Sequence, residues 1–213
     1  MERKPSIYVG LRLAETVRRR AVVAYPTLSD NDRQWIEGIR ARHDPQASII
    51  AAHVTLVFPT EVAEASVVAQ VRTALRLCGS IRLVLRRATT CPDAIESGYY
   101  VVLRADEGHA ELLVVHDALY DGVLASYRRR DIPFEPHVTV GAHSDLSECE
   151  RIANQINEER RIVRARINRV DVIEVGESIV RTVAEIPLGS GGNEPPNPTM
   201  QRTGGSPRSP SGR

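Results

Sequence analysis

The sequence predicts an α+β fold of two similar lobes, packed about a pseudo-two-fold axis with a cleft between them. A His-Val-Thr-aliphatic pattern occurs twice, as HVTL at 53–56 and HVTV at 137–140, 84 residues apart. The order strand, helix, HVT strand, helix, strand also occurs twice. Two like halves in one chain bring equivalent residues together where the halves meet.

The first repeat is predicted by hydrophobic runs that end at proline and by periodic helical faces. The runs RAVVAYP and AAHVTLVFP each close at a proline, as strands do. Ser29 and Asp30 are N-cap candidates for the first helix. The second helix carries Val67, Val71 and Leu75 on one face. The expected elements are a strand at 20–26, a helix from 30 to about 43, a strand at 51–59, a helix at 61–78 and a strand at 80–88.

The second repeat follows the same order. Leu112, Leu119 and Val123 are in phase for a helix, and Cys149, Ile152 and Ile156 are in phase for another. The expected elements are a strand at 98–105, a helix at 107–125, a strand at 136–142 and a helix at 145–158; one long strand or two at 161–175 and a strand at 178–188 then follow.

Composition divides the chain into three parts. Residues 1–20 form an extension whose order the pattern leaves open, 21–188 form the bilobal domain, and 189–213, rich in Gly, Pro and Ser, are expected to be disordered. The extension carries a net charge of +4 and the tail +2, which leaves −5 of the total +1 for the domain. We therefore expect no extended nucleic-acid surface, and a small nucleotide or an RNA end as the partner.

Other bulk features point to a cytoplasmic protein that does not contact the membrane and is a monomer. No apolar stretch reaches the length of a transmembrane helix, and the N-terminus shows no signal peptide. Cys78, Cys91 and Cys149 form no CxxC pair, so neither a disulfide framework nor a zinc knuckle is indicated. No cofactor is expected.

The repeated motif places two kinds of side chain on one face of each strand. Side chains alternate along a strand, so His53, Thr55 and Val57 share one face, and Val54, Leu56 and Phe58 share the other, which we expect to be buried. His137 and Thr139 repeat the arrangement. If both strands border one cleft, two imidazoles and two hydroxyls converge there.

Two facing imidazoles suit phosphodiester chemistry. The ordinary pKa of histidine is about 6.5, so near neutral pH one ring can be neutral and the other protonated. The neutral ring takes a proton from water or a ribose hydroxyl, and the protonated ring gives one to the leaving oxygen. Threonine hydroxyls donate hydrogen bonds to the non-bridging phosphate oxygens. This chemistry needs no metal.

The paired motifs resemble those of the two-histidine phosphoesterases, the 2′-5′ RNA ligase-like or cyclic phosphodiesterase superfamily. The stretch from VVAYPTLSDND to HVTLVFP, and IPFEPHVTVGA, carry the resemblance over about residues 21–188. It implies antiparallel sheets flanking a central cleft with helices outside, and hydrolysis of 2′,3′-cyclic phosphates or 2′-5′ linkages, or reversible 2′-5′ ligation. It also implies that His53 and His137 are catalytic and that Thr55 and Thr139 bind phosphate. Ala52 stands where many members have proline.

Further substrate contacts are candidates on weaker grounds. Phe134 and Tyr99 are aromatic and could stack on a base. His143 lies an even offset from His137, although Gly141 is expected to end the strand before it. The run Arg128–Arg130 could steer a phosphate, but we favour a solvated turn.

Two other functions remain open. A non-catalytic module that binds nucleotides or RNA ends would carry the same motifs and differ only in turnover. A metallohydrolase using His53, His137 and His143 is the third reading, but HxT lacks the usual metal-ligand spacing and no Asp or Glu completes the set.

Overall fold

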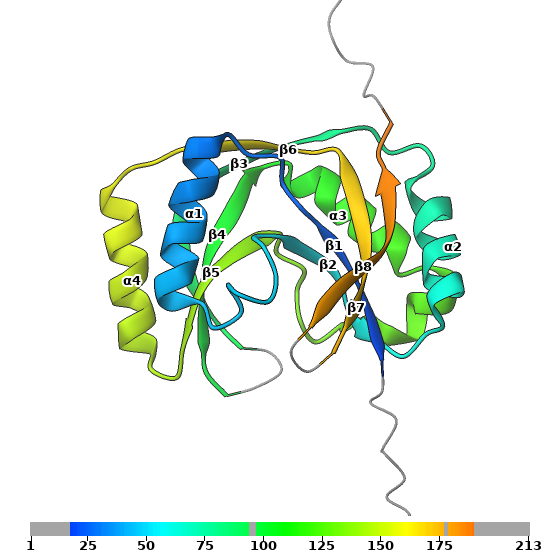
Figure 1. Cartoon of the computed structure of the whole chain (residues 1–213), viewed down its shortest axis with the longest axis horizontal. Helices are drawn as coiled ribbons and strands as arrows, with labels where there is room; N and C mark the ends of the chain where they lie inside the picture. The colour runs from blue at the N-terminus through cyan, green and yellow to red at the C-terminus, as the bar shows by residue number, and fades with distance from the viewer. Residues whose placement is uncertain (1–17, 94–96, 177–178, 190–213) are drawn as a thin grey trace, which may run out of the picture.

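The structure, a computed structural model, describes residues 18–93, 97–176 and 179–189. Two four-stranded antiparallel sheets form its frame (Figure 1). The elements are β1 (Arg19–Ala24), α1 (Asp30–His43), β2 (Val54–Thr60), α2 (Glu64–Leu75), β3 (Ile81–Pro92), β4 (Tyr99–Glu107), α3 (His109–Leu119), the 3₁₀ helix η1 (Gly122–Tyr127), β5 (His137–His143), α4 (Leu146–Glu158), β6 (Val163–Ile167), β7 (Arg169–Val175) and β8 (Val180–Pro187).

The two sheets have equivalent strand orders. The first, sheet A, runs β2-β1-β7-β8, and the second, sheet B, runs β5-β4-β3-β6. The two HVT strands, β2 and β5, each form one edge of their sheet. The predicted α+β fold with two pseudo-symmetric antiparallel sheets is confirmed.

The lobes are not the contiguous halves that the repeated order suggests. The strand expected at 80–88 pairs with β4 and β6 in sheet B, although it lies in the first half of the sequence. The segment 161–175 is two strands in different sheets, β6 in sheet B and β7 in sheet A, separated by Asn168 alone. The Asn168 carbonyl accepts a hydrogen bond from the Leu188 amide, so the last strand is anchored at the same crossing.

The helices lie outside the sheets, with α1 and α4 at one end of the molecule and α2 at the other (Figure 1). Helix α1 contacts β5 and α3 contacts β2, so each helix that precedes an HVT strand packs on the other sheet's HVT strand. The helix expected at 107–125 is wrong in extent. It ends at Leu119, and Gly122, with a φ of 58°, begins a 3₁₀ turn that buries Leu124 and exposes Val123.

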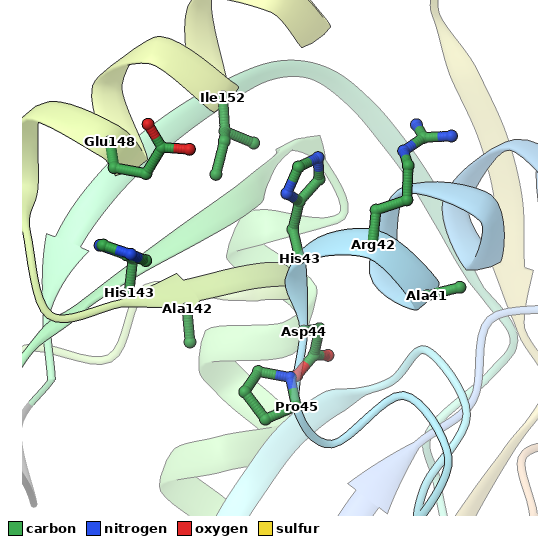
Figure 2. Close-up of a pocket in the computed structure, with 9 residues that line it drawn as sticks. All are labelled: Ala41, Arg42, His43, Asp44, Pro45, Ala142, His143, Glu148 and Ile152. Carbon is green, nitrogen blue, oxygen red and sulfur yellow. The ribbon is translucent and has the colours of Figure 1, made fainter.

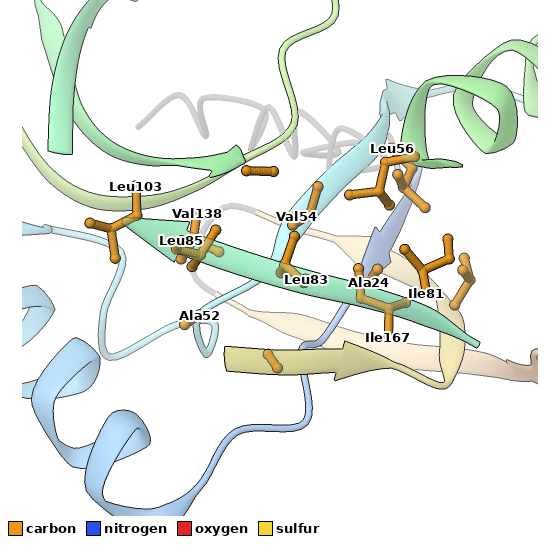
Figure 3. Close-up of a cluster of buried hydrophobic side chains, with 14 of the residues drawn as sticks. Ala24, Ala52, Val54, Leu56, Ile81, Leu83, Leu85, Leu103, Val138 and Ile167 are labelled. Carbon is orange, nitrogen blue, oxygen red and sulfur yellow. The ribbon is translucent and has the colours of Figure 1, made fainter. Parts of the chain in front are cut away.

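One large core joins the two sheets. Val54 and Val138, the residues that follow the two histidines, belong to it together with Leu83 and Leu85 of β3 (Figure 3). A shift in the β1–β2 register pairs Val22 with Val57 and Val23 with Thr55. Val57 therefore enters the core, and Phe58 is half-buried outside it, which reverses the expectation for both residues.

A buried arginine holds the loop that leads into the first HVT strand. Arg40 is 1% exposed, and its guanidinium pairs with the carboxylates of Glu37 and Asp44 at 2.8 and 2.9 Å. It also donates to the Ile50 carbonyl at 2.7 Å, and Glu37 accepts from the Ala52 amide at 2.8 Å. The two residues flanking Ala51 are thus bonded to α1.

The chain ends are only partly described. Most of the expected extension and tail lies outside the described residues. Gly189, the first residue of the expected tail, exchanges backbone hydrogen bonds with Cys78 and Ser80. Within the described ranges, no helix has the length and hydropathy to span a bilayer.

Substituting alanine for glycine should change the free energy of unfolding in opposite directions at two positions. Gly108, before α3, has a φ of 87°, and an added Cβ would overlap the Arg82 carbonyl oxygen. Gly108→Ala should lower the free energy of unfolding by about 2–4 kcal/mol, because strain and overlap add. Gly38 lies within α1 with nothing within 4 Å of its added Cβ, so Gly38→Ala should raise it by about 0.5–1 kcal/mol. Urea denaturation checks both, and equal effects would contradict the account.

Arg40→Met should lower the free energy of unfolding by about 3–5 kcal/mol, because it leaves the Asp44 carboxylate buried without its partner. Arg42→Met is the matched control: Arg42 is exposed on the same helix and should change stability by less than about 0.5 kcal/mol. Thermal and urea denaturation measure both variants, and a loss below 1 kcal/mol for Arg40→Met would show that the network does not hold the loop.

Candidate active site

The two histidines occupy equivalent places and make equivalent hydrogen bonds. His53 immediately precedes β2, and His137 begins β5. The Nδ1 atom of His53 lies 2.8 Å from the Ala51 carbonyl oxygen, and that of His137 lies 2.6 Å from the Glu135 carbonyl oxygen. In each case the partner is the carbonyl two residues earlier in the chain.

These hydrogen bonds set the tautomer of both rings. A carbonyl oxygen only accepts, so Nδ1 must carry the proton in each ring. When the ring is neutral, Nε2 is then the unprotonated nitrogen and can accept a proton. When the ring is protonated, Nε2 is the atom that can give the proton away. Both histidines therefore offer the same atom for acid–base chemistry.

The two histidines lie at the starts of neighbouring edge strands. The edge strands β2 and β5 contact each other, and the two valines that follow the histidines pack in one core cluster. The charge of His137 contributes to lowering the pKa of His53, so the rings lie within electrostatic reach of each other. We call the faces of sheets A and B that carry these rings, opposite the core, the histidine faces.

Burial lowers the pKa of both imidazoles. For His53, loss of hydration is the largest cause, opposed by the hydrogen bond to Ala51 and reinforced by the nearby charge of Arg40. For His137, loss of hydration again dominates, opposed by the bond to Glu135 and reinforced by Arg104. Burial therefore favours the neutral form of both rings in the free protein.

The two threonines share the histidine faces. Thr55 pairs across the sheet with Val23, and Thr139 pairs with Val102, so each hydroxyl has a valine as its strand neighbour. Both threonines are half-buried. Neither hydroxyl has a hydrogen-bond partner among residues 18–93, 97–176 and 179–189, so both can donate to a ligand.

The strand neighbours of the histidines differ, and the sequence did not single them out. Tyr25 comes one residue beyond the Ala24–Val54 pair, and its ring meets that of His53 edge-on with centroids 6.1 Å apart. Arg104 pairs with His137 on β4. Only the register of the sheets identifies them, and no local motif marks either residue.

Phe134 packs against α3 and borders a pocket that neither His53 nor His137 lines. Its ring stacks on His116 of α3 with centroids 3.9 Å apart and an interplanar angle of 11°. The two rings border a pocket of about 330 Å³ with the arginine run Arg128–Arg130. Arg128 bonds Asp117 at 2.6 Å and Arg129 bonds Asp131 at 2.7 Å, so two of the three arginines are already paired.

His143 and Tyr99 lie at the other end of β5. The strand continues through Gly141 to His143, contrary to the expected stop, and a register shift beside Val102 puts His143 opposite Tyr99. Figure 2 shows the His143 ring bordering a pocket of about 430 Å³ with His43 and Glu148. The structure thus separates both residues from the histidine pair. Neither of the two pockets is lined by His53 or His137.

Among the residues that the structure describes, no set of three or more His, Cys, Asp or Glu side chains is arranged to coordinate a metal ion. The set His53, His137 and His143 is not brought together.

Comparison with known proteins identifies the family. Residues 28–178 match the model of the 2′-5′ RNA ligase superfamily. A Bacillus licheniformis protein named "Putative phosphoesterase" is 29% identical over 126 residues, which cover 56% of this chain and 73% of that protein.

Solved structures share the fold. E. coli LigT complexed with 3′-AMP has a TM-score of 0.53 and 18% identity, covering 80% of this chain and 98% of LigT. A structure described as a phosphoesterase has a TM-score of 0.54 and 18% identity, covering 81% and 99%. Kluyveromyces marxianus Usb1 with uridine monophosphate has a TM-score of 0.50 and 14% identity, covering 81% and 99%. The chain therefore belongs to the 2′-5′ RNA ligase superfamily, the two-histidine phosphoesterases that its paired HVT motifs resemble.

Proposed function

We propose that the protein is a metal-independent phosphodiesterase that hydrolyses 2′,3′-cyclic phosphates or 2′-5′ linkages of small nucleotides or RNA ends. The observation that carries the proposal is the matched pair of Nδ1–carbonyl hydrogen bonds, which leaves the Nε2 atoms of His53 and His137 as the two reactive nitrogens. The 3′-AMP on LigT and the uridine monophosphate on Usb1 support a small nucleotide as ligand.

The two rings act on opposite sides of one phosphorus atom. One Nε2 takes a proton from the attacking water as its oxygen bonds to phosphorus. The other Nε2 gives its proton to the ribose oxygen as the phosphorus–oxygen bond breaks. Thr55 and Thr139 donate hydrogen bonds to the non-bridging oxygens, whose charge grows in the transition state. In the reverse of this step the two histidines exchange roles.

The substrate itself supplies what the resting site lacks. Burial favours two neutral rings, yet the reaction needs one protonated ring. A phosphodiester anion next to the imidazoles favours the charged form of one ring and raises its pKa. One ring therefore holds a proton on Nε2 more readily when substrate is bound, and protonation of that ring in turn strengthens phosphate binding.

The binding module without turnover remains the alternative, because it has the same geometry. A non-catalytic protein would bind the nucleotides and release them unchanged. Turnover of 2′,3′-cyclic nucleotides and of 2′-5′ and 3′-5′ dinucleotides, with EDTA present, separates the two functions and also tests metal independence.

His53→Ala or His137→Ala should each lower kcat/KM by about 10²–10⁴-fold, because each removes one partner of the proton transfer. Circular dichroism and the melting temperature check that the fold is kept. His143→Ala is the matched control, since its ring lies at the other end of β5, and it should keep the wild-type rate. Near wild-type turnover by either of the first two variants would refute the proposed mechanism.

The pH dependence of kcat/KM reports the free enzyme, whose two imidazoles both have a pKa below 6.5. The fraction with one neutral and one protonated ring peaks between the two apparent values. We therefore expect a bell-shaped profile with its maximum below about pH 6.5, falling toward neutral pH as the acid loses its proton. A maximum above pH 7, or a flat profile from pH 5 to 8, would contradict this.

A further inference from the structure

On the two histidine faces, each threonine has a valine as its neighbour on the adjacent strand, but the neighbours of the two histidines differ. On sheet B, His137 pairs with Arg104, and Arg104 pairs in turn with Arg87 on β3. Directly paired residues of adjacent strands project to the same face. A row of His137, Arg104 and Arg87 therefore crosses sheet B, starting at the reactive ring.

The two arginines of this row are poorly neutralised. Arg104 donates to the Thr89 hydroxyl at 3.0 Å, and its nearest carboxylate, Glu135, is 3.6 Å away. Arg87 is exposed, and it has no hydrogen-bond or ion-pair partner in the part of the chain that the structure describes. Like charges directly opposite each other in a sheet are destabilising. The fold therefore keeps a pair of cations side by side at a cost in stability.

The equivalent row on sheet A is aromatic, and its cation is fully paired. His53 is followed by Tyr25, which packs against the small apolar cluster of Ala21, Val23, Ile50 and Ile173. The next cation, Arg169 on β7, contacts the buried carboxylate of Asp171 at 2.9 Å and that of Glu185 at 3.0 Å. Sheet A thus offers an apolar surface whose cation is already paired, and sheet B offers excess positive charge.

We propose that this asymmetry orients the substrate: the nucleoside on one side of the reacting phosphate lies against Tyr25, and a second phosphate on the other side binds Arg104 and Arg87. Guanidinium groups bind phosphate oxygens through charge-assisted hydrogen bonds, and an aromatic ring accepts a base. The substrate class is then an oligonucleotide end that carries a phosphate beyond the reacting linkage. This inference rests on the proposed function, because it places the reacting phosphate at the histidine pair.

The experiment compares three 2′-5′-linked diadenosines, one with no terminal phosphate, one with a 5′ phosphate and one with a 3′ phosphate. Isothermal titration calorimetry in a His53→Asn background measures affinity without turnover. We expect a phosphate at one end to tighten binding roughly tenfold and a phosphate at the other end to change it by less than about twofold. Tyr25→Ala should weaken binding of all three ligands.

Adding Arg104→Met and Arg87→Met should abolish the preference between the two phosphorylated ligands. Arg72→Met is the matched control and should keep the preference, because Arg72 is exposed on α2 and has no hydrogen-bond or ion-pair partner among the residues that the structure describes. Arg87→Met should leave the melting temperature unchanged or raise it, because it removes a like-charge pair. If the substitution weakened binding by damaging the fold, the melting temperature would fall instead.

The inference is overturned if the three ligands bind alike, if both phosphates tighten binding equally, or if none binds measurably. Its failure is distinct from failure of the proposed function. Turnover of the dinucleotides by the wild-type protein with equal affinities would end the inference and keep the function. A preference for the phosphate at one end without turnover would support the inferred orientation of the ligand and rule out the proposed phosphodiesterase activity.

Discussion

The hydrogen bond from each histidine Nδ1 to the carbonyl two residues earlier is the constraint on which the site depends. It holds the ring in one tautomer and leaves Nε2 as the nitrogen that can accept or give a proton at both His53 and His137. Without it, either nitrogen could carry the proton, and the two rings would not be matched. Because the acceptor is backbone, the constraint survives changes in nearby side chains and depends on how the strand entrance is held.

The two strand entrances are held in different ways. In the first, buried Arg40 and its partner Glu37 bond the backbone at Ile50 and Ala52, on either side of the acceptor at Ala51. In the second, the Pro136 carbonyl accepts from the Ala105 amide at 3.0 Å, next to the acceptor at Glu135. A polar network anchors one histidine and the sheet itself anchors the other. The two rings are therefore placed pseudo-symmetrically although different interactions hold the backbone beside each of them.

The repeated HVT pattern was enough to predict the two-lobed α+β fold and to single out the motif residues, because alternation along a strand is a local property. The features that sequence did not reveal are non-local. A register shift exchanged the expected places of Val57 and Phe58, and the crossing at Asn168 exchanged strands between the lobes.

Arg104 and Arg87 lie beside His137 only because β3, β4 and β5 pair in this register, and no single segment of the sequence encodes that pairing. Phe134 and His143 were predicted from their nearness to His137 in the sequence, which does not determine the pocket that each side chain borders.

The central claim is that two imidazoles of the same tautomer meet one phosphate. Nitrogen-15 NMR of the histidine rings tests it most directly. In the free protein at pH 7, the account predicts protonated Nδ1 and unprotonated Nε2 for both His53 and His137. Adding adenosine 3′-monophosphate should shift both Nε2 signals, with one ring taking up a proton. A proton on Nε2 rather than Nδ1 in either neutral ring, or a response confined to one of the two histidines, would contradict it.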